Sequence, residues 1–194
     1  AVTTGRPWPT PQNNPAVQGS VLILSDEDDL PRVLLPRLIA NEADTSRVHV
    51  QDAATARPFH VHGGLSRLQA TLDTLGDCRL ILLDPITAYM EGINANSNAE
   101  VRSALVGLQR LAEQYNIAVV AVSHFSKKVD LGAIHRTLGS IAFTAAARSV
   151  WAVVKERRDA GDAGHDSRLW RCLMPVKCNY AIRPRGIRFC IEEP

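Results

Sequence analysis

Short runs of aliphatic residues recur along the chain and are separated by segments with a different hydrophobic spacing. Residues 20–25, 80–84 and 117–123 are nearly continuous aliphatic runs, and residues 47–50 form a shorter one. Continuous apolar runs of this length are typical of strands that are buried on both faces of a parallel sheet. The pattern therefore predicts three buried strands and a weaker fourth strand.

The segments between these runs carry apolar residues at helical spacing. In residues 64–76 the leucines fall on one face of an amphipathic helix. Ser97 and Glu100 match the capping box that starts a helix, and the helix that follows is expected to end at Asn116. Residues 30–38 predict a shorter helix. Strands that alternate with helices in this way indicate parallel βαβ units.

The last third of the chain has a different pattern. Small residues at 141–147 predict a short helix that Arg148 closes. Three strands are expected after it, at 149–154, 169–177 and 187–191. The close turns between them favour antiparallel additions at one edge of the sheet. The predicted fold class is therefore α/β, a three-layer sandwich with a mostly parallel central sheet and antiparallel C-terminal edge strands.

The composition indicates one globular domain over residues 1–194, because 45% of the residues are hydrophobic and 22% are charged. Within it, residues 1–19 are rich in Pro, Asn, Gln and Gly and predict a loop. Residues 126–138 mix charged residues, Gly and His without a period and predict a mobile loop. The pattern indicates neither an internal repeat nor a second domain.

Charge and cysteine content narrow the classes of function. The net charge of +2 is too small to argue for nucleic-acid or membrane binding by itself. No apolar run approaches the roughly 20 residues that cross a bilayer, and the first residues lack the pattern of a secretory signal. The cysteines form no CxxC pair and predict reduced thiols in a cytoplasmic protein. They are Cys78, Cys172, Cys178 and Cys190.

Polar residues follow three of the predicted central strands. Glu27 lies in an acidic cluster after the first strand, Asp84 ends the strand at 80–84, and His124 follows the strand at 117–123. The carboxyl ends of adjacent parallel strands meet at one edge of a sheet, where open α/β sheets bind ligands. An acid that activates water, an aspartate for a metal and a polar sensor are the groups that phosphoryl transfer requires.

Each of these residues also has a purely structural interpretation. The acids at 26–29 suit the start of a helix, where free N–H groups favour negative charge. Asp84 and Pro85 suit a simple turn after a strand. His124 could be an ordinary histidine without a catalytic role, and Arg148 could complement the dipole of the helix that it closes.

Several segments, taken in order, resemble a known family. They are residues 4–9, 21–29, 80–85, 119–127 and 139–148. In this order, and over nearly the whole chain, they resemble the RecA-like P-loop ATPases related to RepA, a hexameric replicative helicase. The resemblance implies a RecA-like core that hydrolyses ATP with the help of Mg²⁺.

The resemblance also implies a role for each candidate residue. Glu27 would polarise the attacking water, and Asp84 would be the Walker B aspartate that holds Mg²⁺ through water. His124 would sense the γ-phosphate of ATP. Arg148 would be an arginine finger that reaches the nucleotide of a neighbouring subunit, so that hydrolysis depends on assembly. Lys177 would approach the phosphates.

The implied function is that of a helicase core in a ring of identical subunits, expected to be a hexamer, that moves along single-stranded DNA in replication. Loop 126–138 is the expected DNA contact through Lys127, Lys128 and Arg136, although a solvated basic loop is an open alternative. Two other functions stay open. The first is a RecA-like regulatory or assembly ATPase without helicase activity, and the second is an inactive homologue that acts as a binding module. No membrane partner is expected.

Two departures from the family pattern affect these expectations. The chain contains no GxxxxGK[ST], the P-loop that holds phosphates with backbone N–H groups and a lysine. We expect the first strand, the P-loop and its helix to lie upstream of residue 1 or to have been lost, which leaves the core N-terminally incomplete. These 194 residues should then bind ATP poorly and expose apolar surface at a gap in the sheet. The second departure is Asn179, where related ring helicases carry a basic residue.

Overall fold

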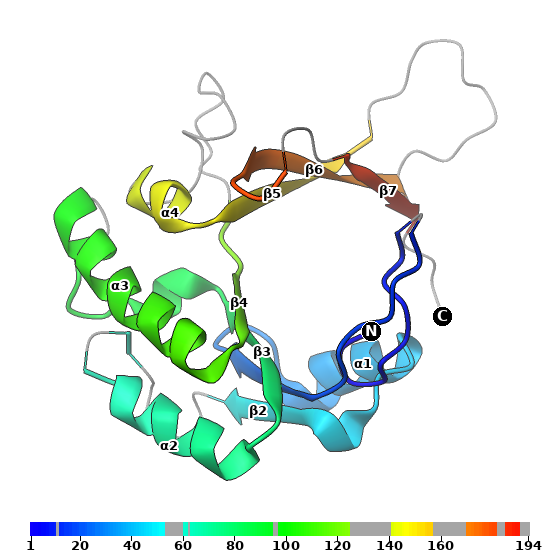
Figure 1. The fold of residues 1–194 in the computed structure, drawn as a ribbon, viewed down its shortest axis with the longest axis horizontal. Helices are drawn as coiled ribbons and strands as arrows, with labels where there is room; N and C mark the ends of the chain where they lie inside the picture. The colour runs from blue at the N-terminus through cyan, green and yellow to red at the C-terminus, as the bar shows by residue number, and fades with distance from the viewer. Residues whose placement is uncertain are drawn as a thin grey trace. The chain divides into compact units, whose positions relative to one another are not determined.

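The computed structural model divides into two compact units, which are described separately (Figure 1). The first unit contains the described residues up to 124, and the second contains those from 141 onward. The residues that the structure describes are 1–10, 12–52, 60–61, 63–94, 97–124, 141–156, 170–181 and 185–190.

A parallel sheet forms the centre of the first unit. Its strands are β1 (Ser20–Ser25), β2 (Val48–Asp52), β3 (Cys78–Asp84) and β4 (Ala118–Ala121). They pair in the order β2-β1-β3-β4, and every pair is parallel. All six residues of β1 are buried, because the strand has a neighbour on each side and the sheet is covered on both faces. This burial explains why its sequence is a continuous apolar run.

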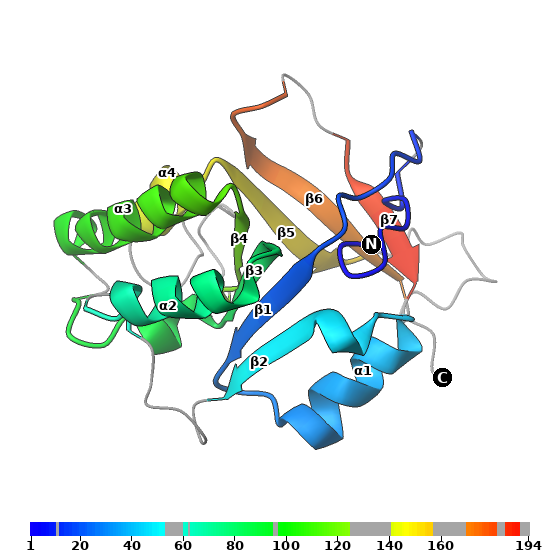
Figure 2. The same cartoon turned by 60° about the horizontal axis from the view of Figure 1, so that its bottom comes forward.

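The helices of the first unit cover both faces of this sheet. They are α1 (Leu35–Ala40), α2 (Leu65–Leu75) and α3 (Asn98–Tyr115). The connection from β1 to β2 runs in one direction across the sheet, and those from β2 to β3 and from β3 to β4 run in the other. Right-handed crossovers therefore place α1 on one face and α2 and α3 side by side on the opposite face, as Figures 1 and 2 show.

Short helical turns complete the first unit. A π-helical turn at Leu30–Leu34 precedes α1, and 3₁₀ turns occur at Thr45–Arg47 and Ile86–Tyr89. The helix predicted at residues 30–38 therefore begins as a π-helical turn and continues to Ala40.

Helix α3 begins where the capping box predicts. The Ser97 hydroxyl accepts a hydrogen bond from the backbone N–H of Glu100, and Asn116 ends the helix in a left-handed conformation. The phenolic O–H of Tyr115 donates to a carboxylate oxygen of Asp73 at 2.7 Å, which joins α3 to α2. The buried residues of α3 face the core at helical spacing. They are Val101, Ala104, Leu105, Leu108 and Leu111.

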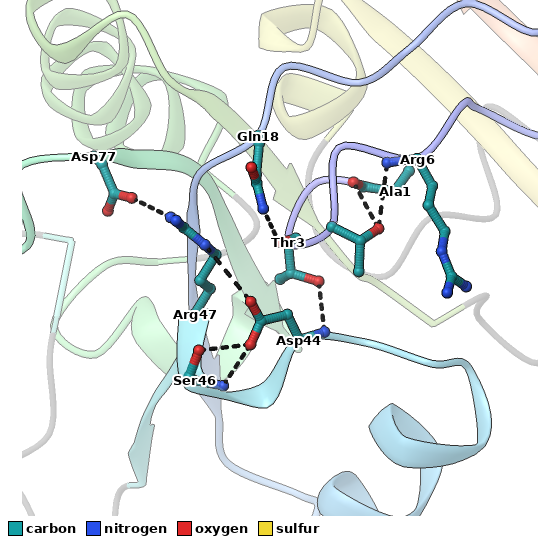
Figure 3. Close-up of polar contacts among 9 residues, drawn as sticks. Ala1, Thr3, Arg6, Gln18, Asp44, Ser46, Arg47 and Asp77 are labelled. Carbon is teal, nitrogen blue, oxygen red and sulfur yellow. Dashed lines mark hydrogen bonds and ion pairs between the residues drawn. The ribbon is translucent and has the colours of Figure 1, made fainter.

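The amino-terminal segment is tied to the amino edge of the sheet by polar contacts (Figure 3). The Thr3 hydroxyl accepts a hydrogen bond from the backbone N–H of Asp44, and the Gln18 side chain donates to the carbonyl of Thr3. Arg47 lies between Asp44 and Asp77, with 2.6 Å from its Nη1 to Oδ2 of Asp77. These contacts lie at the end of the sheet opposite to Asp84, since the carbonyl of Asp77 accepts from the first residue of β1.

The second unit contains a short helix and an antiparallel sheet. Its elements are α4 (Ile141–Ala146), β5 (Ser149–Lys155), β6 (Trp170–Cys178) and β7 (Ile187–Cys190). The strands pair in the order β5-β6-β7 and form a three-stranded sheet of their own. The predicted α/β fold class is confirmed, with a parallel sheet between helices and antiparallel strands at the carboxyl end.

Strand β4 is the last strand of the parallel sheet. Among the described strands it is hydrogen-bonded only to β3, and its Val120 side chain is 48% exposed. An edge strand of small and apolar residues without a charge is unusual, because such an edge can pair with further chain. It matches the exposed apolar surface that the sequence predicted.

In the described part of the chain, no helix is both long and apolar enough to span a membrane.

Candidate active site

The order of the parallel strands brings three polar groups to one edge of the sheet. Strand β3 lies between β1 and β4, and Ser25 of β1 is in register with Asp84 of β3. The backbone N–H of Asp26 donates to the carbonyl of Asp84 at 3.1 Å, and that of Val122 donates to the carbonyl of Leu83 at 2.8 Å. The chain therefore leaves all three strands at the same level.

Glu27 and His124 meet across this edge. The distance between Oε2 of Glu27 and Nε2 of His124 is 3.4 Å, and more than half of each side chain is exposed. A long, exposed contact of this kind contributes little to stability. Its importance is its position, because the two residues follow the strands on either side of the strand that ends in Asp84.

Asp84 is partly buried at the end of β3, whereas Glu27 is exposed. Partial burial raises the pKa of Asp84, and the nearby carboxylates of Asp28 and Glu27 raise it further, while His124 and Arg37 act in the opposite direction. A cation beside Asp84 would relieve this repulsion.

The four adjacent acids after β1 have different partners in the structure. A carboxylate oxygen of Asp29 accepts from the backbone N–H of Arg32 and caps the turn that precedes α1. Asp28 forms an ion pair with Arg37 at 2.9 Å, whereas Glu27 faces His124. Helix capping and a site residue thus coexist in one cluster, because successive side chains leave the chain in different directions.

Ser123 is a site candidate to which the sequence pattern assigned no role. Its hydroxyl is buried at the carboxyl end of β4 and has no hydrogen-bond partner among the described residues. Buried hydroxyl groups are normally hydrogen-bonded, so an unsatisfied one next to His124 is consistent with a polar ligand. Its position at the end of an apolar strand, directly before His124, is the only sequence signal for it.

The carboxylates at this edge suit a magnesium ion that is held jointly with phosphates. Among the described residues, no three His, Cys, Asp or Glu side chains are arranged to hold a metal ion by themselves. Mg²⁺ usually takes one or two protein carboxylates and completes its shell with water and phosphate oxygens. Asp84, with Glu27 nearby, meets that requirement on the protein side.

The predicted arginine and lysine belong to the second unit. Arg148 lies between α4 and β5, separated from the helix by Ala147, and its side chain is exposed. None of the described residues gives its guanidinium group a hydrogen bond or an ion pair. The ammonium group of Lys177, on β6, donates to the carbonyl oxygens of Thr144, Ala145 and Ala147. Lys127, Lys128 and Arg136 lie outside the described residues, as does loop 126–138.

A family model described as an AAA domain matches residues 1–130, which is about two thirds of the 194 residues. This chain belongs to the AAA domain family. The match includes the strands and loops that carry Glu27, Asp84 and His124, and it ends before α4 and the antiparallel sheet. A search of curated proteins found no match.

Membership in the AAA domain family bears on how the residues at the strand ends are interpreted. It is a family of P-loop ATPase-like proteins, so nucleotide binding is the chemistry that the match supports. In a protein of this kind, an aspartate at the carboxyl end of a buried strand is where the metal of the nucleotide is held. The matched range contains the edge of the sheet at which Glu27, Asp84 and His124 lie.

We predict that replacing Asp84 by Asn stabilises this AAA domain at pH 7. A raised pKa in the folded state means that the charged carboxylate opposes folding above that pKa, and this penalty disappears as pH falls toward the unfolded value of 3.8. Solvent screens the exposed neighbours, so the gain should be at most about 1 kcal/mol, or roughly 2–4 °C in Tm.

Thermal unfolding of Asp84→Asn and the unchanged protein, followed by circular dichroism between pH 4 and pH 8, checks this prediction. The difference in Tm should shrink steadily toward the acidic end. Glu113→Gln is the matched control, because it removes one negative charge from α3, away from the strand ends. A lower Tm for Asp84→Asn at pH 7 would contradict the assignment of Asp84 as a strained carboxylate.

Proposed function

We propose that the chain forms the metal and water side of the ATPase site of a replicative DNA helicase. One observation carries the proposal. Glu27 and His124 are 97 positions apart, yet they lie with Asp84 at one edge of the parallel sheet of an AAA domain. The helicase assignment rests on the family resemblance of the ordered sequence segments, and the ATPase chemistry rests on the site.

In this proposal each residue has a distinct task. The Glu27 carboxylate accepts a hydrogen bond from the attacking water and aligns it. Asp84 would hold the metal through water, and its carboxylate is partly buried at the end of β3. His124, in contact with Glu27, links the state of the γ-phosphate to the segment that follows β4. When bound, Mg²⁺ supplies positive charge that offsets the charge on the phosphates.

The groups that would hold the phosphates are not among these residues. The 194 residues contain no GxxxxGK[ST] motif, and a carboxylate edge by itself repels a triphosphate. We propose that a phosphate-binding segment outside residues 1–194 completes the site. Among the described strands β4 pairs only with β3, and this free edge, with the exposed Val120, supports an additional strand at this position.

Residues 1–194 alone should bind ATP poorly, because the cradle of backbone N–H groups is missing. Equilibrium dialysis with ATP and Mg²⁺ should show little bound nucleotide for the 194-residue polypeptide and clear binding for the full-length gene product. Asp84→Asn in the full-length protein should weaken the contribution of Mg²⁺ to that binding. Micromolar affinity of the 194 residues alone would contradict the proposal.

Hydrolysis is proposed to occur between subunits, with Arg148 of one subunit at the nucleotide of the next. Support comes from the position of Arg148, since its guanidinium group is exposed and has no partner among the described residues. An arginine finger is worth about 10³- to 10⁵-fold in the rate of hydrolysis.

Mixing two inactive variants tests this arrangement. In the full-length protein, Arg148→Ala and Glu27→Gln should each reduce ATP hydrolysis to a small residual rate, for Arg148→Ala about 10³- to 10⁵-fold below the unchanged protein. A mixed assembly restores interfaces in which an intact Glu27 meets an intact Arg148, so the mixture should hydrolyse ATP. A mixture of Arg148→Ala with Arg148→Lys is the control and should stay inactive. If the Glu27→Gln and Arg148→Ala mixture is also inactive, the site does not lie between subunits.

Movement along single-stranded DNA is proposed to depend on the basic residues after β4. Fluorescence anisotropy with labelled oligo(dT) should show binding that weakens as salt rises, because phosphate contacts release counterions. Lys127→Ala and Lys128→Ala together should reduce both the affinity and the salt slope. Lys155→Ala on β5 is the matched control. Binding that is absent or indifferent to salt would favour the regulatory ATPase.

A further inference from the structure

The ammonium group of Lys177 is fully occupied by the end of helix α4. Its Nζ lies 3.1 Å from the carbonyl oxygen of Thr144, 2.8 Å from that of Ala145 and 2.8 Å from that of Ala147. An ammonium group has three N–H donors, so each donor has one acceptor. The last carbonyl groups of a helix have no partner within the helix, and Lys177 supplies these partners from strand β6.

The residue that directly follows β6 holds the backbone on the other side of Arg148. The N–H of Asn179 donates to the carbonyl of Arg148 at 2.9 Å. Ser149, the next residue, is in register with Cys178 at the start of the β5–β6 ladder. The carbonyl before Arg148 is therefore bonded to Lys177, and the carbonyl of Arg148 itself is bonded to Asn179.

The packing of α4 explains why breaking the bonds from Lys177 would be unfavourable. Ala142, Phe143 and Thr144 are buried, so the helix is seated by one side and its end is fixed by Lys177. If the ammonium group moved away to a phosphate, the carbonyl of the buried Thr144 would lose this donor. Leaving a buried carbonyl without a partner is unfavourable. The contact of Lys177 with α4 is therefore not easily exchanged for a ligand.

We propose that Lys177 is a positioning residue that acts through Arg148. It joins the carboxyl end of α4 to β6 and thereby fixes the backbone from which the exposed Arg148 side chain extends. Lys177 itself does not contact the phosphates, in contrast to the role that the family resemblance implies for it. This inference rests on the proposed function of Arg148 as the residue that reaches a neighbouring nucleotide.

The first test measures the contact without nucleotide. Lys177→Met keeps most of the length of the unbranched side chain but removes the ammonium group and its donors, and Lys177→Arg keeps charge and donors. Amide hydrogen exchange of the 194-residue protein is measured at Ala147 and Asn179, whose N–H groups donate to the carbonyl groups of Phe143 and Arg148. The exchange should be faster in Lys177→Met and recover in Lys177→Arg. Unchanged exchange in Lys177→Met overturns the inference.

The second test measures hydrolysis by the full-length gene product. Lys177→Met should lower kcat by roughly 10- to 100-fold, as expected for a misplaced catalytic group, without weakening ATP binding. In an Arg148→Ala background it should have no further effect, because its only route of action has been removed. Lys155→Met is the control lysine. Weaker ATP binding, or an additional loss in the Arg148→Ala background, overturns the inference in favour of a phosphate contact.

The two tests separate the inference from the proposed function. If the full-length protein does not hydrolyse ATP at all, the proposed function fails, whereas faster exchange in Lys177→Met still establishes that Lys177 holds the backbone at Arg148. If hydrolysis is present and Lys177→Met does not change kcat, the proposed function stands and the positioning role is wrong.

Discussion

Parallel pairing of β1, β3 and β4 is the constraint on which the candidate site depends. In a parallel sheet every strand points the same way, so the chain leaves each strand at the same edge. The register of Ser25 with Asp84, and the bond from Val122 to Leu83, set the three exits at one level. Glu27 and His124 can therefore meet although 97 positions separate them. A change in strand order would separate the same residues without altering any of them.

The charges at this edge oppose folding at neutral pH. Asp84 is partly buried and lies among other carboxylates, so its pKa is raised and its charged form opposes folding. The neighbouring acids are distributed among a helix cap, an ion pair with Arg37 and a contact with His124. A cluster that served stability alone would not need a repelled carboxylate at its centre. Natural proteins tolerate such strain where a ligand compensates for it.

Much of the fold was predictable because burial leaves a periodic signal. The continuous aliphatic residues of β1 and β3 indicated strands buried on both faces, and the Ser97 capping box located the start of α3. The position of Glu27, Asp84 and His124 at one edge of the sheet was predictable, because each stands at or shortly after the end of a recognisable strand. Ser123 and the contacts of Lys177 were not, because a buried hydroxyl and a lysine bonded to carbonyls 30 or more positions away leave no local pattern.

The sequence by itself determined which segments are strands and helices, which polar residues follow the strands, and that the 194 residues contain no GxxxxGK[ST] motif. Only the tertiary structure decided the strand order β2-β1-β3-β4, the sharing of the acidic cluster between capping and the site, and the attachment of Lys177 to α4. The physical reason is that hydrophobic periodicity reports how each residue is buried. Which strand pairs with which, and which donor finds which carbonyl, are settled between segments far apart in the chain.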